Sequence, residues 1–243
     1  MADSRIYDFK GGEVLLVNKP LDWTSFDVVN KLRYTIKHKI KVKKIKVGHA
    51  GTLDPLADGL LIICTGKKTK TIESLMGMEK TYSGIIRLGA TTPSYDLETE
   101  IDQTFSTEHI AEDLILKSAK EMEGVQDQYP PIFSAKKIDG KKAYELARKG
   151  ANVELKSKKI EISQFEITKI DQNDIHFLIR CSKGTYIRSI AHDFGKALKS
   201  GAHLASLRRE SIGEFELKNA KSVNEWMEEI KNCEFIHDSE TSN

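Results

Sequence analysis

The stretch GHAGTLDPLADGLL, at positions 48–61, holds the first residue whose type and setting could support chemistry. Its Asp54 follows a turn of small residues, precedes Pro55 and leads into the apolar run from Leu60 to Ile63. Two interpretations are open. Either the carboxylate caps its own turn, which is the usual role of an Asp before Pro, or it performs a reaction, acting covalently or through its charge.

Three other motifs lack residues that their chemistry requires. TGKKT (65–69) has Leu61 and Lys68 where a phosphate-binding Walker loop needs Gly and then Ser or Thr. HDFG (192–195) lies in an amphipathic helical pattern with no kinase catalytic loop before it, and SAKK (134–137) has no companion motifs. None of the three predicts a nucleotide site or a serine nucleophile.

Composition places the chain in a broad class. Its 243 residues, 39% hydrophobic and 30% charged, suffice for one sizeable core or two modest domains. No apolar run predicts a membrane span, and the N-terminus has no apolar signal segment. The histidines form no His-x-x-x-His pair, so no metal site is expected. Three distant cysteines (Cys64, Cys181 and Cys233) argue against a disulfide framework and favour a reduced, cytoplasmic protein.

The net charge of +2 hides an uneven distribution of basic and acidic residues. Eight Lys or Arg and no acid lie between Lys31 and Lys46, and the pair Arg208–Arg209 adds to the basic groups. Six acids and one lysine lie between Glu225 and Glu240. A polyanion-binding face needs such segregation. On charge alone, a solvated surface with a flexible basic loop is the simpler interpretation.

Hydrophobic periodicity predicts the elements that must position these residues. We expect strands over 13–20, 60–66, 80–89, 159–170, 174–182 and 212–217. We expect helices over 24–36, 69–77, 108–123, 141–150, 185–201 and 223–230. The alternating residues from Lys39 to Lys43 fit an edge strand or a loop that becomes ordered on binding. Strands joined by hairpins, with helices inserted irregularly, predict an α+β domain with a mixed, largely antiparallel sheet.

Several separated stretches share one resemblance. They are LLVNKPLDWTSFDVVNKLR, GHAGTLDPLADGLL with TGKKTK, KTYSGIIRLGATTPSYD, YPPIFSAKKIDGKKAYELARKG, and CSKGTYIRSIAHDFGKAL with GAHLASLRR. In order and spacing, from about Val14 to Phe215, they resemble the TruB-type tRNA pseudouridine synthases, which isomerise the T-loop uridine at tRNA position 55. The sequence departs from the family at Asp22, where a glycine is usual.

The resemblance implies a pseudouridine synthase catalytic fold. We expect a single catalytic domain over residues 1–243, with an RNA-clamping insertion at about 124–150. A C-terminal extension at about 216–243 is shorter than the roughly 40 residues that an independent fold usually needs. A form without the full PUA domain of many family members is therefore expected.

The resemblance also assigns catalytic roles. Asp54 would act on the ribose or the base, Arg188 in TYIR would pair with that carboxylate, and Tyr82 would stack on the target base and take a proton. Without this context, Arg188 would be taken for a surface helix residue and Tyr82 for an outward strand aromatic.

Other motif positions are expected to bind or surround the substrate. His49 would fill the space left by the flipped base, the Tyr186 hydroxyl would bond substrate or the carboxylate pair, and Leu207 would form pocket wall. Lys70 would contact phosphate or support the structure, and Asp96 would anchor a neighbouring group. Lys19 also matches a family motif position.

The reaction and its partner follow from the same resemblance. Pseudouridine is an isomer of uridine, so the implied reaction needs no cofactor, no metal and no redox partner. The expected partner is the T-arm of tRNA, bound by a monomer. Two alternatives stay open: a pseudouridine synthase acting on a different RNA, and a noncatalytic tRNA-binding or tRNA-folding protein.

Overall fold

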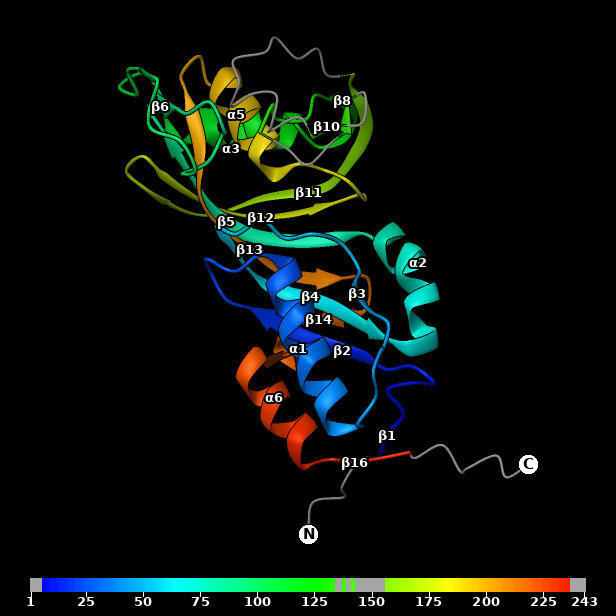
Figure 1. The fold of residues 1–243 in the computed structure, drawn as a ribbon. Helices are drawn as coiled ribbons and strands as arrows, with labels where there is room; N and C mark the ends of the chain where they lie inside the picture. The colour runs from blue at the N-terminus through cyan, green and yellow to red at the C-terminus, as the bar shows by residue number, and fades with distance from the viewer. Residues whose placement is uncertain (1–5, 134–136, 139–140, 143–155, 237–243) are drawn as a thin grey trace, which may run out of the picture. The chain divides into compact units, whose positions relative to one another are not determined.

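The computed structural model describes residues 6–133, 137–138, 141–142 and 156–236 (Figure 1). The chain divides into two compact units, Met1–Met78 with Arg208–Asn243, and Glu79–Leu207. Strand β13 (Ala202–Ile212) passes from the second unit into the first. The single domain expected over residues 1–243 stays a prediction. None of the described helices is both long and apolar enough to cross a bilayer.

The first unit combines helices with a sheet whose strand order is β15-β2-β4-β13. Its main strands are β2 (Val14–Lys19) and β4 (Ala57–Thr65), and its helices are α1 (Ser25–Lys39), α2 (Ile72–Gly77) and α6 (Val223–Asn232). The shorter elements are β1 (Ile6–Tyr7), β3 (Val47–His49), the 3-10 turns η1 (Gly66–Thr71) and η2 (Leu217–Asn219), β14 (Phe215–Glu216), β15 (Lys221–Ser222) and β16 (Glu234–Phe235).

The predicted start of the first helix is confirmed. The Thr24 side chain accepts a hydrogen bond from the Asp27 amide, and the Asp27 carboxylate accepts one from the Thr24 amide. This reciprocal capping box satisfies two amide groups that would otherwise lack partners at the helix N-terminus. Val28, Leu32 and Ile36, which recur at helical spacing, form a buried apolar face of this helix.

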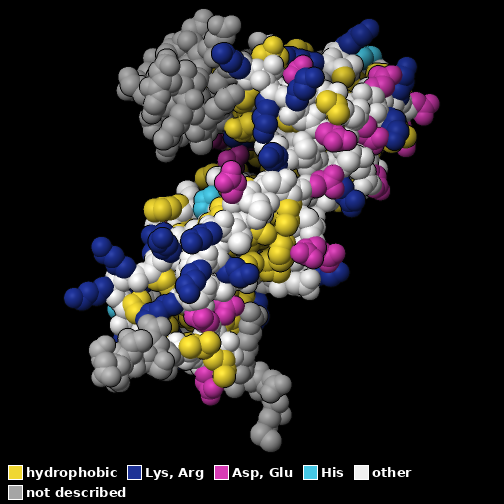
Figure 2. Space-filling view, turned by 90° about the vertical axis from the view of Figure 1, so that its right-hand side faces the viewer, with side chains coloured by type: hydrophobic (Ala, Val, Ile, Leu, Met, Phe, Trp, Pro, Cys, Tyr) yellow, Lys and Arg dark blue, Asp and Glu magenta, His cyan; other side chains and the backbone are white. Residues whose placement is uncertain are grey.

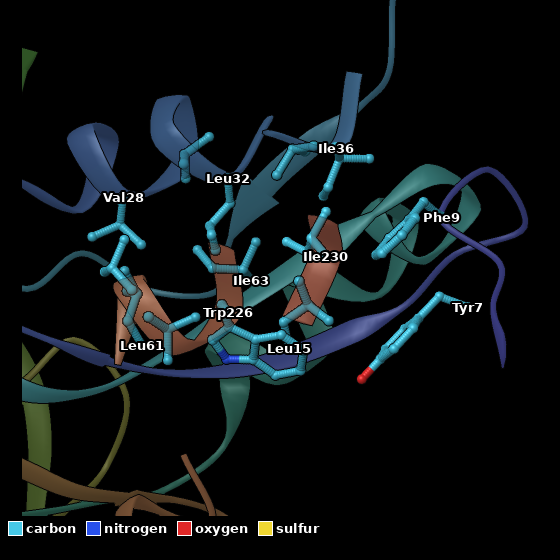
Figure 3. Close-up of a cluster of buried hydrophobic side chains, with 14 residues drawn as sticks. Tyr7, Phe9, Leu15, Val28, Leu32, Ile36, Leu61, Ile63, Trp226 and Ile230 are labelled. Atoms are coloured by element: carbon cyan, nitrogen blue, oxygen red, sulfur yellow. The ribbon is translucent and has the colours of Figure 1, made fainter. Parts of the chain in front are cut away.

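Strand β4 is apolar along most of its length because both of its faces are covered. Leu61 and Ile63 pack with α1, α6 and β2 in one cluster, which includes Trp226 and Ile230 (Figure 3). The alternate residues of β4 belong to a second cluster of buried side chains, which is made of Ala50, Leu60, Ile62, Cys64, Leu75 and Ile212.

The basic run does not form an edge strand, so that interpretation is wrong. Helix α1 continues to Lys39, with Ile40 as its C-cap. Residues 41–46 then form an irregular connection to β3, with Lys41 in the left-handed region at φ 52°. The alternating residues from Lys39 to Lys43 are therefore divided between the end of this helix and an irregular connection.

The second unit has the strand order β13-β5-β12-β11-β8. These strands are β5 (Lys80–Leu88), β8 (Gly124–Gln128), β11 (Lys158–Asp171) and β12 (Asp174–Cys181). The helices are α3 (Glu112–Glu121) and α5 (Ile187–Ala197). The short strands are β6 (Ala90–Thr91), β7 (Gln103–Thr104), β9 (Lys137–Ile138) and β10 (Lys141–Lys142).

Most elements predicted in this unit are confirmed. Strands β11 and β12 form the expected antiparallel hairpin, whose turn places Gln172 at φ 55°. Helix α3 begins at Glu112, four residues later than predicted. Of the helix predicted over 141–150, Lys141–Lys142 are in strand β10 and the rest lies outside the described residues.

Two glycines permit close approach of other strands to β13. A Cβ at Gly84 would lie 2.3 Å from the carbonyl oxygen of Ser206, and a Cβ at Gly59 would lie 2.5 Å from that of Arg209. Gly59 also has φ +104°, which side chains rarely adopt. Strand pairs β15–β2 and β1–β16 are parallel, whereas β2–β4, β5–β12 and β11–β12 are antiparallel. The predicted α+β fold with a mixed, largely antiparallel sheet is confirmed.

Candidate active site

Asp54 lies in the turn between β3 and β4 of the first unit and is half buried. The main chain closes this turn, because the Asp54 carbonyl accepts a hydrogen bond from the Ala57 amide at 3.1 Å. The carbonyl of Pro55 accepts one from the Asp22 amide at 2.9 Å. These main-chain hydrogen bonds close the turn, and they do not involve the Asp54 carboxylate.

Two buried side chains that sequence reasoning missed hold the loop before Asp54. The Ser25 hydroxyl donates to the Leu53 carbonyl at 3.1 Å and accepts from the Leu53 amide at 2.8 Å. The guanidinium of Arg209, only 1% exposed, donates to the carbonyls of Gly51, Thr52 and Leu60 at 3.1, 3.4 and 2.7 Å. These contacts fix the backbone on both sides of the candidate nucleophile.

Of the pair Arg208–Arg209, which we counted among the basic groups of a possible binding face, only Arg208 lies on the surface. Adjacent residues of a strand point to opposite faces of a sheet, so Arg209 is buried while Arg208 is exposed. Arg208 forms a bidentate ion pair with Asp58, in which its Nε and Nη2 donate to the two carboxylate oxygens at 2.9 and 2.6 Å. Strand alternation within the motif ASLRR was the signal that could have separated the two arginines.

We predict that Arg209→Met lowers the free energy of unfolding by about 3 kcal/mol, because several buried carbonyls lose their donor. Arg208→Ala is the matched control on the same strand. The Arg208 side chain is 50% exposed, so its ion pair with Asp58 should contribute less than about 1 kcal/mol to the free energy of unfolding. Chemical denaturation followed by circular dichroism measures both values, and equal losses would contradict the special role of Arg209.

Lys19 is fully buried, and its ammonium donates to the carbonyls of Pro20 and Trp23 at 2.8 and 2.7 Å. Burial lowers the pKa of Lys19 to about 8, although the carboxylates of Asp58 and Asp54 oppose this shift. The ammonium therefore remains largely charged at neutral pH, within the electrostatic reach of Asp54. Its hydrogen bonds hold the turn that follows β2.

His49 and Lys70 differ sharply in exposure. His49 ends β3 and is half buried, and its Nδ1 is buried with no hydrogen-bond partner among the described residues. Burial, reinforced by the positive charge of Arg209, holds the pKa of His49 below its ordinary value. The ring is therefore neutral at neutral pH. Lys70 lies in η1 and is exposed to solvent.

Arg188 is the most constrained of the predicted residues in the second unit. It lies in the first turn of α5 and is 5% exposed, so the surface position that it would have without family context does not apply. Its Nη1 donates to the carbonyls of Phe133 and Ser94 at 2.9 and 3.2 Å. Its Nε lies 3.6 Å from a carboxylate oxygen of buried Asp96. This arrangement fixes the plane of the guanidinium.

The remaining predicted residues lie on β5, at the start of α5 and on β13. Tyr82 is 9% exposed on β5 rather than directed outward. Tyr186 is the N-cap of α5, and its main chain exchanges two hydrogen bonds with the side-chain amide of Gln128, at 2.8 and 3.0 Å. Leu207 is half buried on β13. Gln128, which sequence reasoning missed, thus fixes the start of the helix that carries Arg188.

Each unit therefore brings some of the predicted residues together. The charge of Asp54 acts on Lys19 in the first unit, and Arg188 contacts Asp96 in the second. Asp54 belongs to the first unit and Arg188 to the second. Their pairing, and the catalytic and binding roles of all nine residues, stay predictions.

Two solved structures have folds similar to that of this chain. One is described as the structure of an H/ACA RNP bound to a substrate RNA containing 2'-deoxyuridine. It has a TM-score of 0.64 and 25% identity, covering 90% of this chain and 53% of that chain. The other, a Cbf5-Nop10-Gar1 complex, has a TM-score of 0.65 and 24% identity, covering 95% of this chain and 64% of that one.

Curated relatives are much closer in sequence. The tRNA pseudouridine synthase B of Flavobacterium johnsoniae is 56% identical over 225 residues, covering 92% of this chain and 98% of the relative. The tRNA pseudouridine synthase B of Phocaeicola vulgatus is 53% identical over 234 residues, covering 95% of this chain and 100% of the relative. Residues 37–187 match the family described as TruB family pseudouridylate synthase (N terminal domain). The chain therefore belongs to the TruB family of pseudouridylate synthases, and it is an isomerase.

Proposed function

We propose that this protein converts the T-loop uridine at position 55 of tRNA into pseudouridine, with Asp54 as the essential carboxylate. The observation that carries the proposal is the half-buried Asp54, presented on a loop that Ser25 and Arg209 hold in place. The names of the relatives, tRNA pseudouridine synthase B, support tRNA as the substrate.

The proposed reaction exchanges one bond to the ribose for another. The N1–C1′ bond breaks, the uracil turns, a C5–C1′ bond forms, C5 loses its proton and N1 gains one, so substrate and product have the same composition. Asp54 either bonds to the substrate or stabilises the oxocarbenium-like species formed at C1′. Tyr82 stacks on the base and takes a proton during turnover.

Arg188 is proposed to orient the carboxylate of Asp54. An ionised carboxylate in a dry pocket needs a partner, and a planar guanidinium can hold both of its oxygens. The contacts of Arg188 with Ser94, Phe133 and Asp96 support this role because they already fix the guanidinium plane. Tyr186 and Leu207 complete the proposed pocket with a hydroxyl and an apolar side chain.

The target uridine must leave its stack before it can react, at a cost of a few kcal/mol. We propose that His49 occupies the space that the base vacates. Its lowered pKa supports this role, since a neutral ring can stack between bases without bringing a desolvated charge. Lys70, which is exposed, is proposed to contact phosphate.

A basic groove on the first unit is the proposed site for the RNA backbone. It has a volume of about 740 Å³, and its charged lining residues are Arg33, Lys37, Lys43, Lys44 and Lys46. Lys and Arg side chains gather over this part of the surface (Figure 2). Lys39, which we placed in the same run, instead donates to the Lys231 carbonyl at 2.7 Å. The insertion at 124–150, also proposed to hold RNA, lies partly outside the described residues.

We predict that replacing Lys43, Lys44 and Lys46 together with Ala weakens tRNA binding about tenfold. It should also reduce the slope of log K against log salt by about 2, because each lost phosphate contact removes about 0.7–0.9. A matched variant removes three ion-paired lysines instead, Lys169, Lys218 and Lys231, with the same change in net charge. Binding titrations at several salt concentrations measure the tRNA affinity and the slope for both variants. Identical slopes would show that the groove does not bind the RNA backbone.

The substrate proposal is tested with two tRNA transcripts that differ only at position 55. The protein should form pseudouridine at position 55 of the uridine transcript, and none in a transcript carrying cytidine there. Carbodiimide modification followed by primer extension locates the product. Pseudouridine elsewhere in the tRNA, or only in other RNAs, would favour the alternative of a different target.

A further inference from the structure

Helix α5 presents two side chains, one turn apart, to the loop that follows β6. Residues four apart on a helix lie on the same face. Arg188 contacts the carbonyl of Ser94 and the carboxylate of Asp96. His192 stacks on the ring of Tyr95, with centroids 3.9 Å apart and planes 11° from parallel. Three consecutive loop residues therefore contact one helix face.

Tyr95 has an unusual backbone conformation. Its φ of 64° lies in the left-handed region, which costs free energy for a residue with a side chain. The loop around it is closed by hydrogen bonds from the Tyr95 amide to the Thr92 carbonyl at 3.0 Å, and from the Leu204 amide to the Tyr95 carbonyl at 2.8 Å. The conformation at Tyr95 sets the directions of both the Ser94 carbonyl and the Asp96 side chain.

The contact between Tyr95 and His192 is a stack of two neutral rings. Burial, reinforced by the charge of Lys196 and opposed by Asp102, lowers the pKa of His192 to about 4. The Nδ1 atom of His192 is buried without a hydrogen-bond partner in the part of the chain that the structure describes. The contact of His192 with the loop is made through the face of its ring.

We infer that the Tyr95–His192 stack is a positioning element, which holds the backbone of residues 94–96 so that Ser94 and Asp96 fix the guanidinium of Arg188. This inference rests on the proposed function, in which Arg188 orients Asp54. Tyr95 and His192 are positioning residues that act through Arg188, and they do not touch the reacting atoms.

The test compares variants that remove a ring with variants that keep one. Tyr95→Ala and His192→Ala should lower the single-turnover rate at saturating tRNA at least tenfold, with the Kd for tRNA changed less than threefold. Tyr95→Phe and His192→Phe should keep the rate within about threefold, because stacking needs only the aromatic face. Wild-type rates in both Ala variants, or a loss confined to Kd, would overturn the inference.

A double-variant comparison separates positioning from a general structural defect. In an Arg188→Lys background, Tyr95→Ala should reduce the remaining rate less than twofold, since both changes act on the same group. A further tenfold loss in that background would show that Tyr95 does not act through Arg188. Wild-type protein that forms no pseudouridine in tRNA would instead contradict the proposed function.

A measurement that needs no enzyme activity distinguishes failure of this inference from failure of the proposed function. The Nε–H signal of Arg188 in a ¹⁵N NMR spectrum can be assigned by its absence in Arg188→Lys. It should keep its chemical shift in the Tyr95→Phe variant and shift or broaden in Tyr95→Ala. An unchanged signal in Tyr95→Ala would overturn the inference, whatever reaction the protein catalyses.

Discussion

Asp54→Asn should abolish pseudouridine formation while tRNA affinity stays within about tenfold of wild type, about 1.4 kcal/mol. Asparagine has the shape of aspartate, and the turn around it is closed by main-chain hydrogen bonds and by Ser25 and Arg209. The variant should therefore fold and bind while lacking the charge that the reaction needs. Single-turnover assays and binding titrations on the same preparation measure the two quantities.

Asp58→Asn is the matched control for this experiment. It lies in the same motif, and its carboxylate is hydrogen-bonded to Arg208. This variant should keep a rate within a few fold of wild type. A noncatalytic tRNA-binding or tRNA-folding protein would tolerate both changes equally. Undiminished turnover in Asp54→Asn would remove Asp54 from the reaction.

Arg188→Lys should lower the rate by about 10² or more, the usual loss when one preorganised donor is removed from an active site. Lysine keeps the charge, but a single ammonium cannot reach the Ser94 and Phe133 carbonyls and also hold both oxygens of a carboxylate. Single-turnover kinetics at saturating tRNA measure this loss directly.

Arg87→Lys is the control for Arg188→Lys. Arg87 also forms a bidentate ion pair, donating to the two carboxylate oxygens of Asp174 at 2.7 and 2.8 Å, but its side chain is 49% exposed. Replacing it should leave the rate nearly unchanged, because exposed ion pairs contribute little. Equal rates for Arg188→Lys and Arg87→Lys would contradict the proposal that the Arg188 guanidinium holds both oxygens of the Asp54 carboxylate.

Elements with strong local signals could be predicted from the sequence. The capping box at Thr24, the hairpin between β11 and β12, and helix α6 all depend on residues close together in the chain. Strand β13 was missed because its residues, AHLASLRRESI, include charged and polar side chains that obscure an apolar alternation. One of those charged residues, Arg209, can be buried because the backbone carbonyls of Gly51 and Leu60, which are far away in the sequence, accept hydrogen bonds from its guanidinium.

The candidate site divides in the same way. Family motifs indicated Asp54, Arg188 and Asp96, and Arg188 lies 3.6 Å from a carboxylate oxygen of Asp96, while the roles of all three stay predictions. The side chains that support them come from segments far away in the sequence, as Ser25 does for Leu53 and Gln128 for Tyr186. Such supports depend on tertiary packing, so no local pattern could have indicated them.

The most direct test of the central claim is tritium release from tRNA labelled at C5 of uridine. Wild-type protein should release tritium as the C5–C1′ bond forms, and the modified nucleotide should map to position 55, while Asp54→Asn should release none. Wild-type protein that releases no tritium, or an Asp54→Asn variant that releases it at the wild-type rate, would contradict an isomerisation that depends on this carboxylate.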